Sequence, residues 1–481
     1  MWRRNVASRV AKGVAREATS YPEVCEHEVG EHARTMLAPF TSSKPVPGQP
    51  PLVMVKAEGC YVYDETGKSY LDGLAGLWST SLGVQPRLAE AAKKQMDELP
   101  YYHSFWNRTT DVASQLSSEL VGLGKALDVK KVFFTTSGSE ANDTNVKVAW
   151  YYWNALGKPQ RKKIIARHKA YHGVTIAASS LSGLPALHKA FDPIPLDFVR
   201  HTDTPHFWRH GRPGETESEF SGRLARNLED LILKEDPETI AAFIAEPIMG
   251  AGGVIPPPEG YFDKIQQVLK KYEILFIADE VVTAFGRIGH MFGSEHFQMK
   301  PDLITTAKAI SNAYVPLGAA FITQRVADVV DAHSGSMGTF GHGFTYSGHP
   351  VSCAVALEAL KIYRELDIPR RVREDIGPAF QSGLRVIGEE SQIVGEVRGN
   401  GMMAAMELAR HRDPGRPLPP ELSSASYLAS RALEYGLIVR AVGDIVILSP
   451  PLVLSHAELS EMMAKLRMAL QDTENMVAYK T

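Results

Sequence analysis

Polar residues that are suited to chemistry follow several short apolar runs of this chain. They are residues 168–173, Glu246, Asp279 and Lys308. In an open α/β sheet the carboxyl ends of parallel strands lie at one edge, and such sheets bind their ligands at that edge. If each apolar run is a parallel strand, these polar segments meet there. The spacing therefore predicts one shared site.

Lys308 is the residue best placed for covalent chemistry. A lysine beside an apolar run ordinarily extends its amine into solvent, and this interpretation stays open. The functional interpretation is a lysine that forms a Schiff base with a carbonyl compound. Only about one lysine amine in a thousand is neutral near neutral pH, so burial or a nearby cation must first lower its pKa.

Asp279 directly follows the apolar run Ile274–Ala278. A carboxylate buried there needs a cation or hydrogen-bond donors as partners, because an unpaired buried charge is costly. One interpretation is a structural salt bridge. The other is a protonated pyridine nitrogen, since pyridoxal phosphate sites combine a Schiff-base lysine with an acidic partner for that nitrogen.

A phosphate site is one interpretation of the sequence Ser137-Gly-Ser-Glu-Ala-Asn-Asp, which follows an apolar run and begins a helical pattern. Ser137 and Glu140 have the spacing of a capping box. The free amides of Gly138 and Ser139 at a helix N-terminus would suit a phosphate dianion. A plain capped helix explains the sequence equally well. A second Gly/Ser/Thr-rich stretch, residues 341–350, is either a turn or another phosphate clamp.

The elements that would position these residues alternate between strands and helices. Short apolar runs occur at Val132–Phe134, Ile164–Ala166, Ile240–Ala245, Ile274–Ala278 and Leu303–Thr305. Helical patterns, such as the one at Tyr261–Tyr272, separate several of them. This alternation predicts an α/β fold in which a large domain contains a mostly parallel sheet. From about residue 367, helical patterns and short strands predict a smaller C-terminal α/β domain.

We expect four segments along the chain. They are an organelle presequence at residues 1–20, an N-terminal arm with a β-hairpin that belongs to the small domain at 21–84, the large cofactor-binding domain at 85–366 and the rest of the small domain at 367–481. The first segment is rich in arginine, and it has no acidic residue before Glu17. This composition is typical of a mitochondrial presequence, with plastid and cytoplasmic locations as alternatives.

The composition excludes several classes of protein. Among the 481 residues, 44% are hydrophobic and 22% are charged, which excludes a mainly disordered chain. The net charge of −3 gives no basic surface for nucleic acid. No apolar run approaches the roughly 18 residues of a membrane span. The three cysteines form no CxxC pair, which argues against a disulfide framework or a cysteine zinc site.

The histidines His201, His206 and His210 are crowded in the sequence in a way that metal sites also show. Pro205 prevents them from sharing one face of a helix, and metal sites demand strict ligand geometry. We therefore expect a loop without a metal ion.

As a set, the motifs of this chain resemble those of the class III (fold type I) pyridoxal-phosphate aminotransferases. Within that family the resemblance is greatest to the plant pyruvate/glyoxylate-dependent 4-aminobutyrate transaminases. It extends from about Pro39 to Val477 and rests on Gly73-Leu-Ala-Gly-Leu-Trp, Tyr102-His-Ser-Phe-Trp-Asn-Arg-Thr-Thr, Ser137-Gly-Ser-Glu-Ala-Asn-Asp, Tyr171-His-Gly, Glu246-Pro-Ile-Met-Gly-Ala-Gly-Gly-Val-Ile-Pro-Pro-Pro, Asp279-Glu-Val, Phe285-Gly-Arg, Lys308-Ala-Ile-Ser and Arg440-Ala-Val-Gly-Asp. The chain departs from the family at Thr283-Ala284 and at Asn312-Ala313, near the expected site.

The resemblance implies a role for each cofactor-binding residue. Lys308 would bind pyridoxal phosphate covalently and then move the substrate proton, and Asp279 would pair with the pyridine nitrogen. The remaining contacts would come from Val281 and Tyr171 on the two ring faces, from Ser137, Gly138 and Ser139 at the phosphate, and from Thr345 of a second subunit, with Phe344 beside it.

The resemblance also implies a set of substrate-binding residues besides Tyr171. Trp78 and Phe105 would form aromatic walls of the pocket. Arg440 would be a mobile arginine that meets an α-carboxylate, and Glu246 and Arg398 would form a glutamate–arginine pair.

The activity that the resemblance implies is transfer of the amino group of 4-aminobutanoate to pyruvate or glyoxylate, which leaves succinate semialdehyde. A homodimer with shared active sites is implied as well. The alternatives are another ω-transaminase, for example one that aminates aromatic aldehydes of the vanillin type, an aminomutase on the same scaffold, and a binding protein that keeps the fold without the chemistry.

Overall fold

The structure is a computed structural model that describes residues 36–41, 51–410 and 413–480. These residues fall into two compact units. The first contains the described residues up to 55 together with 64–67, and the second contains residues 56–63 and the described residues from 68 onward. All elements that matter for the site lie in the second unit. The expected presequence at residues 1–20 lies outside the described residues.

A seven-stranded sheet forms the centre of the second unit, with the strand order β4-β10-β9-β8-β7-β5-β6. The strands are β4 (Val129–Thr135), β5 (Lys163–Arg167), β6 (Val199–Thr202), β7 (Ile240–Ala245), β8 (Leu275–Asp279), β9 (Leu303–Thr306) and β10 (Gly318–Thr323). Strand β10 is antiparallel to both of its neighbours, and the other adjacent pairs are parallel. The prediction of a mostly parallel sheet is therefore confirmed.

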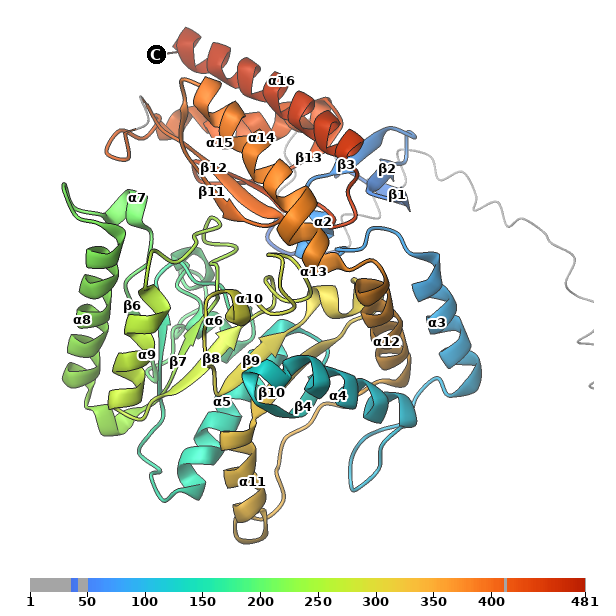
Figure 1. The fold of residues 1–481 in the computed structure, drawn as a ribbon, viewed down its shortest axis with the longest axis vertical. Coiled ribbons are helices and arrows are strands. Elements are labelled where there is room, and N and C mark those ends of the chain that lie inside the picture. Colours follow the sequence, from blue (N-terminus) through green and yellow to red (C-terminus); the bar gives the residue numbers. More distant parts are fainter. Residues whose placement is uncertain (1–35, 42–50, 411–412, 481) are drawn as a thin grey trace, which may run out of the picture. The chain divides into compact units, whose positions relative to one another are not determined.

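Helices cover both faces of this sheet (Figure 1). Consecutive residues of a strand point to opposite faces, and here the residues on both faces are apolar. Phe243 and Phe276 pack in one cluster, and their neighbours Ile244 and Ile277 pack in another. The first cluster includes side chains of α3 (Pro86–Glu98), α4 (Asp111–Leu123), α8 (Glu217–Glu235), α9 (Tyr261–Lys271) and α12 (Pro350–Glu365). The second includes side chains of α5 (Gly138–Ala155), α6 (Ile176–Leu181) and α11 (Gln324–Met337). Each fully buried side chain of this size stabilises the fold by about 1.5–3 kcal/mol.

The C-terminal part of the chain forms a second, antiparallel sheet with the order β11-β12-β15-β14. Its strands are β11 (Val394–Asn400), β12 (Met403–Leu408), β14 (Arg440–Val442) and β15 (Ile445–Leu448). The accompanying helices are α14 (Gly377–Glu390), α15 (Ser424–Glu434) and α16 (His456–Lys480). The predicted smaller α/β region is thus present.

The predicted β-hairpin near the N-terminus is confirmed. Strand β2 (Tyr61–Asp64) pairs antiparallel with β3 (Ser69–Asp72). Strand β3 also pairs in parallel with β13 (Leu437–Ile438), so the hairpin is joined to the C-terminal part of the chain. These strands and β1 (Met54–Glu58) form a third small sheet.

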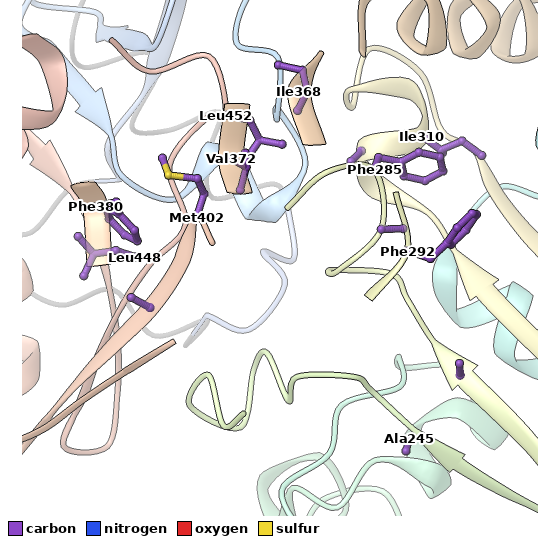
Figure 2. Packing of buried hydrophobic residues seen from close by; sticks show 14 of the residues in the cluster. Ala245, Phe285, Phe292, Ile310, Ile368, Val372, Phe380, Met402, Leu448 and Leu452 are labelled. Carbon is purple, nitrogen blue, oxygen red and sulfur yellow. The ribbon is translucent and has the colours of Figure 1, made fainter. Parts of the chain in front are cut away.

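The largest apolar cluster extends from the central sheet into the C-terminal region. Figure 2 shows part of it, with Phe285, Ile310 and Phe292 near the sheet and Phe380 and Leu448 in the C-terminal region. All five side chains are at most 1% exposed. None of the described helices has the length and apolar content that a membrane crossing requires.

Candidate active site

The polar segments predicted to form one site lie at one edge of the seven-stranded sheet. Strands β5, β7, β8 and β9 are adjacent and parallel, so their carboxyl ends point the same way. Glu246 directly follows β7, Asp279 is the last residue of β8, and Lys308 follows β9. This edge is where open α/β sheets bind ligands.

Asp279 is a buried carboxylate with three hydrogen-bond donors. Its Oδ2 accepts hydrogen bonds from His172 Nδ1 and Asn142 Nδ2, each at 2.8 Å. Its Oδ1 accepts one from the Val281 backbone N–H at 3.1 Å. Burial by itself would raise the pKa of Asp279, but these hydrogen bonds outweigh burial and hold the pKa below its usual value. The carboxylate is therefore ionised near neutral pH, as a partner for a cationic ring nitrogen must be.

His172 and Asn142 were not predicted from the sequence as partners of this carboxylate. Asn142 also donates to the His172 C=O at 2.7 Å and accepts from Thr305 Oγ1 at 2.7 Å. Asn145 Nδ2 donates to Thr305 Oγ1 at 2.8 Å. A signal for this network was present in the sequence, because two amides three residues apart share a face of a helix that is otherwise largely apolar.

Replacing His172 by phenylalanine removes one of the two side-chain donors at Asp279 Oδ2. We expect the pKa of Asp279 to rise, so that the acid limb of the pH–activity profile moves to higher pH. A hydrogen bond to a charged group contributes about 1.5–3 kcal/mol, so cofactor retention should fall about ten- to a hundredfold. Cofactor release during dialysis and the pH profile of kcat/KM check both effects.

The matched control for this prediction is Ser182→Ala. The Ser182 Oγ accepts a hydrogen bond from the backbone N–H of His172 at 2.8 Å but does not bond to Asp279. Ser182→Ala should leave the acid limb in place. An equal shift in both variants would contradict a specific role for the imidazole.

Lys308 begins a short 3-10 turn, Lys308–Ser311, after β9. Its φ of 51° lies in the left-handed region, which is uncommon for a lysine and is found at functional sites. Burial lowers the pKa of its amine, and the nearby charge of Arg440 lowers this pKa further. The carboxylates of Asp279 and Glu246 raise it, but the net shift of the pKa is downward. A lowered pKa enlarges the neutral fraction of the amine, which is the form that attacks a carbonyl group.

The N-terminus of α5 approaches the same edge of the sheet. A Cβ on Gly138 would lie 2.8 Å from Val281 Cγ2, so only glycine permits this contact. Ser137 is the N-cap, and its Oγ accepts from the Glu140 N–H at 3.2 Å. The predicted capped helix is therefore present. Its first N–H groups, which include those of Gly138 and Ser139, have no acceptor within the helix and suit a phosphate.

The residues present fit pyridoxal phosphate. Its aldehyde, ring nitrogen and phosphate require an amine with a lowered pKa, an ionised carboxylate and a group of free N–H donors. Lys308, Asp279 and the start of α5 offer these groups at one edge of the sheet. Val281 lies beside Gly138, and its N–H donates to Asp279.

Tyr171 and Glu246 lie close to one another in this site. The Glu246 carboxylate accepts from the backbone N–H groups of Tyr171 at 3.1 Å and Gly250 at 2.8 Å, and burial raises its pKa. Burial also raises the pKa of the Tyr171 hydroxyl. The negative charge of Asp279 raises this pKa further, and the positive charge of Arg440 lowers it. Both charged groups therefore lie near enough to act on the Tyr171 hydroxyl.

The structure does not join Glu246 to Arg398, although the resemblance implied such a pair. Arg398 Nη1 lies 2.5 Å from Glu396 and 2.6 Å from Glu407, and its other nitrogens donate to the Gly253 C=O at 2.9 and 2.7 Å. The reason is the register of β11 and β12, in which Glu396 and Glu407 are directly opposite. Two like charges at such a position repel each other and need a cation between them.

Arg440 is the first residue of β14, and it is half-buried. Burial lowers the pKa of its guanidinium, and Tyr171 acts in the opposite direction. Among the described residues, no carboxylate forms a salt bridge with it, so its charge is available to a substrate. Trp78 is 3% exposed and packs in one cluster with Val442 of the same strand and with Ile445.

Phe105 and Thr345 lie in two other loops. A Cβ on Gly343 would lie 2.9 Å from the Phe105 ring, so these loops are in contact. Thr345 is exposed, and its C=O accepts a hydrogen bond from Tyr101 OH at 2.8 Å. Neither residue has a described contact with Lys308 or Asp279.

One cluster in the described part of the chain, formed by His206, Glu396 and Glu407, offers three potential metal ligands within 4.8 Å of one another. His201 and His210 are not part of it. Both carboxylates already have cationic partners, because Arg398 contacts both and Arg209 lies 2.5 Å from Glu407. We therefore interpret the cluster as an ion-pair network that holds residues 253–254 through Arg398.

Comparisons with known proteins agree with this geometry. The family model for aminotransferase class III matches residues 43–470. The chain is 57% identical to gamma aminobutyrate transaminase 3, chloroplastic, from Solanum lycopersicum, over 93% of this chain and 86% of that protein. It is 55% identical to gamma-aminobutyrate transaminase 1, mitochondrial, from Oryza sativa subsp. indica, over 94% of this chain and 87% of that protein.

Solved structures are similar to the chain over most of its length. The omega transaminase from Pseudomonas jessenii in complex with PMP has a TM-score of 0.90 and 44% identity, covering 94% of this chain and 99% of that one. A transaminase with L-ala has a TM-score of 0.86 and 46% identity, covering 89% of this chain and 100% of that one.

Proposed function

The chain belongs to the class III aminotransferases, and from this membership we propose that it transfers the amino group of 4-aminobutanoate to an oxo acid. Its cofactor is pyridoxal phosphate. The observation that supports this substrate is the sequence identity of 57% to a gamma aminobutyrate transaminase over nearly the whole chain. The acceptor that we propose is pyruvate or glyoxylate, which leaves succinate semialdehyde as the other product.

The residues of this site divide the work of the reaction between them. When bound, pyridoxal phosphate supplies an electron sink for the carbon that loses its proton. The Lys308 amine, once free, takes that proton from the substrate carbon and returns a proton later in the cycle. Asp279 stays ionised and holds a proton at the pyridine nitrogen. The start of α5 binds the phosphate, and Tyr171 and Val281 hold the ring between them.

The proposed function is tested by absorbance and by a substrate panel. The visible absorbance of the purified protein should bleach when 4-aminobutanoate is added and return when pyruvate or glyoxylate is added. A panel of amine donors and oxo-acid acceptors, measured as kcat/KM, should rank 4-aminobutanoate first among the donors. Preference for a bulky amine or for an aromatic aldehyde would favour a different ω-transaminase. Absence of the absorbance band would favour a protein without the chemistry.

Arg440→Ala should separate the two halves of the reaction. Pyruvate has a carboxylate next to its reacting carbon, and the planar guanidinium of an arginine can bind this carboxylate with two hydrogen bonds. A donor whose carboxylate is far from the reacting carbon needs no cation at that place. A hydrogen-bonded charge contributes about 1.5–3 kcal/mol, so kcat/KM for pyruvate should fall about ten- to a hundredfold and that for an uncharged amine donor should fall less. Half-reaction kinetics check this, and equal losses for both would refute the proposed role.

We propose that the active protein is a homodimer. Three aromatic side chains in this region are exposed: Trp106 by 79%, Tyr346 by 57% and Tyr101 by 38%. The ring centroids of Tyr101 and Tyr346 are 6.0 Å apart. Exposed aromatic residues in contact with one another are typical of interfaces. The Thr345 C=O accepts a hydrogen bond from Tyr101 OH, and the resemblance implies that Thr345 contacts the cofactor of the second subunit. Dilution to the monomer should release cofactor, and a monomer with full cofactor affinity in ultracentrifugation would contradict the proposal.

The relatives carry mitochondrial or chloroplastic names, which supports a location in an organelle. For this chain we propose mitochondria, because residues 1–20 are rich in arginine and contain a single acidic residue. Residues 1–40 fused to a fluorescent protein should reach mitochondria. Plastid or cytosolic fluorescence would contradict this.

A further inference from the structure

Asn312 joins the turn of Lys308 to a distant part of the chain. Its Oδ1 accepts a hydrogen bond from the Leu82 N–H at 2.8 Å, and its Nδ2 donates to the Gly83 C=O at 2.8 Å. The partners are 230 and 229 positions away in the sequence. Asn312 is 0% exposed, so water cannot replace these bonds.

The backbone of Asn312 is suited to the same place. Its φ is 51°, and its N–H donates to the Ala309 C=O at 3.1 Å, which ends the turn that Lys308 begins. Asparagine tolerates the left-handed region better than most residues do. One residue therefore ends the Lys308 turn and satisfies two backbone groups of residues 82–83.

The neighbouring residues of both segments are also joined. Tyr314 OH accepts a hydrogen bond from the Gln85 N–H at 2.7 Å. On the other side, Ser81 is held by Leu452, whose N–H donates to the Ser81 C=O at 2.7 Å, and by Arg287, which donates to Ser81 Oγ at 3.0 Å. Within the described chain, Asn312 is the one side chain that contacts both Leu82 N–H and Gly83 C=O.

The segment that Asn312 holds leads to Trp78, which the resemblance implies is an aromatic wall of the substrate pocket. Trp78 lies four residues before Leu82 and packs with Val442 of the strand that carries Arg440. Residues 82–83 are thus joined to Trp78 by a short stretch of chain. Lys308 lies four residues before Asn312, so the two hydrogen bonds of Asn312 connect the Lys308 turn to residues 82–83.

We propose that Asn312 is a positioning residue that fixes the Lys308 turn relative to residues 78–83 and thereby selects donors by their length. The proposal rests on the proposed function, because Trp78 is assigned to the substrate pocket only by the resemblance to the aminotransferases. A long ω-amino donor extends further from the Lys308 amine than a short donor does, so its binding depends more on this spacing. A short donor such as L-alanine depends on it less.

The test is Asn312→Gly in the cofactor-bound enzyme. Glycine adopts the left-handed conformation without strain, so the variant removes the two side-chain hydrogen bonds and keeps the backbone conformation of the turn. Since small misplacements of reacting groups are costly, kcat/KM for 4-aminobutanoate should fall about ten- to a hundredfold, and that for L-alanine by a clearly smaller factor. The pH midpoint of the visible absorbance band should also shift, because the Lys308 amine changes its surroundings.

Gln381→Ala is the matched control. Gln381 is a buried amide that likewise bridges two backbone groups, donating to the Gly401 C=O at 2.9 Å and the Met403 C=O at 3.1 Å. It should lower the Tm and leave the donor ratio and the absorbance midpoint unchanged. If Asn312→Gly changes both readouts no more than Gln381→Ala does, Asn312 is only structural and the proposal is overturned.

Two further measurements keep the result clear. Tyr314→Phe removes only the bond to Gln85 and should change the donor ratio in the same direction by a smaller factor, and it replaces Asn312→Gly if that variant does not fold. If the wild-type protein does not use 4-aminobutanoate, the proposed function fails. The absorbance midpoint and the ratio of another ω-amino donor to L-alanine then still decide the role of Asn312.

Discussion

Lys308→Ala is expected to abolish covalent attachment of the cofactor and to reduce turnover by a factor of about ten thousand or more. The amine attaches the cofactor and also moves the substrate proton, and a positioned acid–base group by itself contributes about 10²–10⁴-fold. Burial at the carboxyl edge of the sheet lowers its pKa, which enlarges the fraction of the neutral amine that attacks a carbonyl group. Borohydride reduction followed by peptide mapping should place the pyridoxyl group on Lys308 in the wild-type protein and nowhere in the variant.

Lys169→Ala is the matched control for this variant. Lys169 also follows a strand of the same sheet, has a left-handed φ of 66°, and has a pKa that burial lowers. The label should remain on Lys308 in this variant. If the label moves to Lys169 in Lys308→Ala, or if the wild-type protein carries it at any other lysine, the assignment of Lys308 is wrong.

The strands that carry the site were predictable because their sequences are locally unambiguous. The five apolar residues before Asp279 fill both faces of a covered sheet, and the polar residue after them marks the carboxyl edge. Strands β6 and β10 were not indicated. The centre of β6 is Arg200-His201, and β10 begins with Gly318 and two alanines, so neither has a strong apolar pattern. The position of β10 between β4 and β9 depends on pairing with both neighbours.

The partners within the site were less predictable, because they come from distant parts of the chain. His172 and Asn142 are 107 and 137 positions from Asp279, and no local pattern connects them. The implied pair of Glu246 and Arg398 is absent for a related reason. Glu396 lies two residues before Arg398 on β11, and the register of β11 and β12 places Glu407 opposite Glu396, so these two carboxylates take the guanidinium.

Asp279→Asn is expected to reduce kcat about 10²–10³-fold while the fold is retained. The substitution keeps the shape of the side chain and removes its charge, and removing one preorganised electrostatic group from a transition state has an effect of this size. The amide cannot hold a proton at the ring nitrogen, so the cofactor should also bind less tightly. Single-turnover kinetics with 4-aminobutanoate and the cofactor dissociation constant measure the two effects.

The pH dependence of stability gives an independent readout for the same variant. The folded-state pKa of Asp279 is lowered, so its ionised form stabilises the fold above the ordinary aspartate pKa, and this contribution is lost as the pH falls through the lowered value. Asp279→Asn should therefore flatten this part of the acid unfolding curve.

Asp302→Asn is the matched control for Asp279→Asn, because it changes another buried aspartate at the opposite end of the same strands. The Asp302 carboxylate accepts from the Phe276 N–H at 2.9 Å and pairs with Arg325 at 2.9 Å. Burial raises the pKa of Asp302, so the shift is opposite in direction to that of Asp279. Asp302→Asn should change stability and leave kcat and cofactor affinity nearly unchanged. If both variants lose kcat equally, the effect of Asp279 comes from the packing of the sheet, and its charge does not act on the cofactor ring.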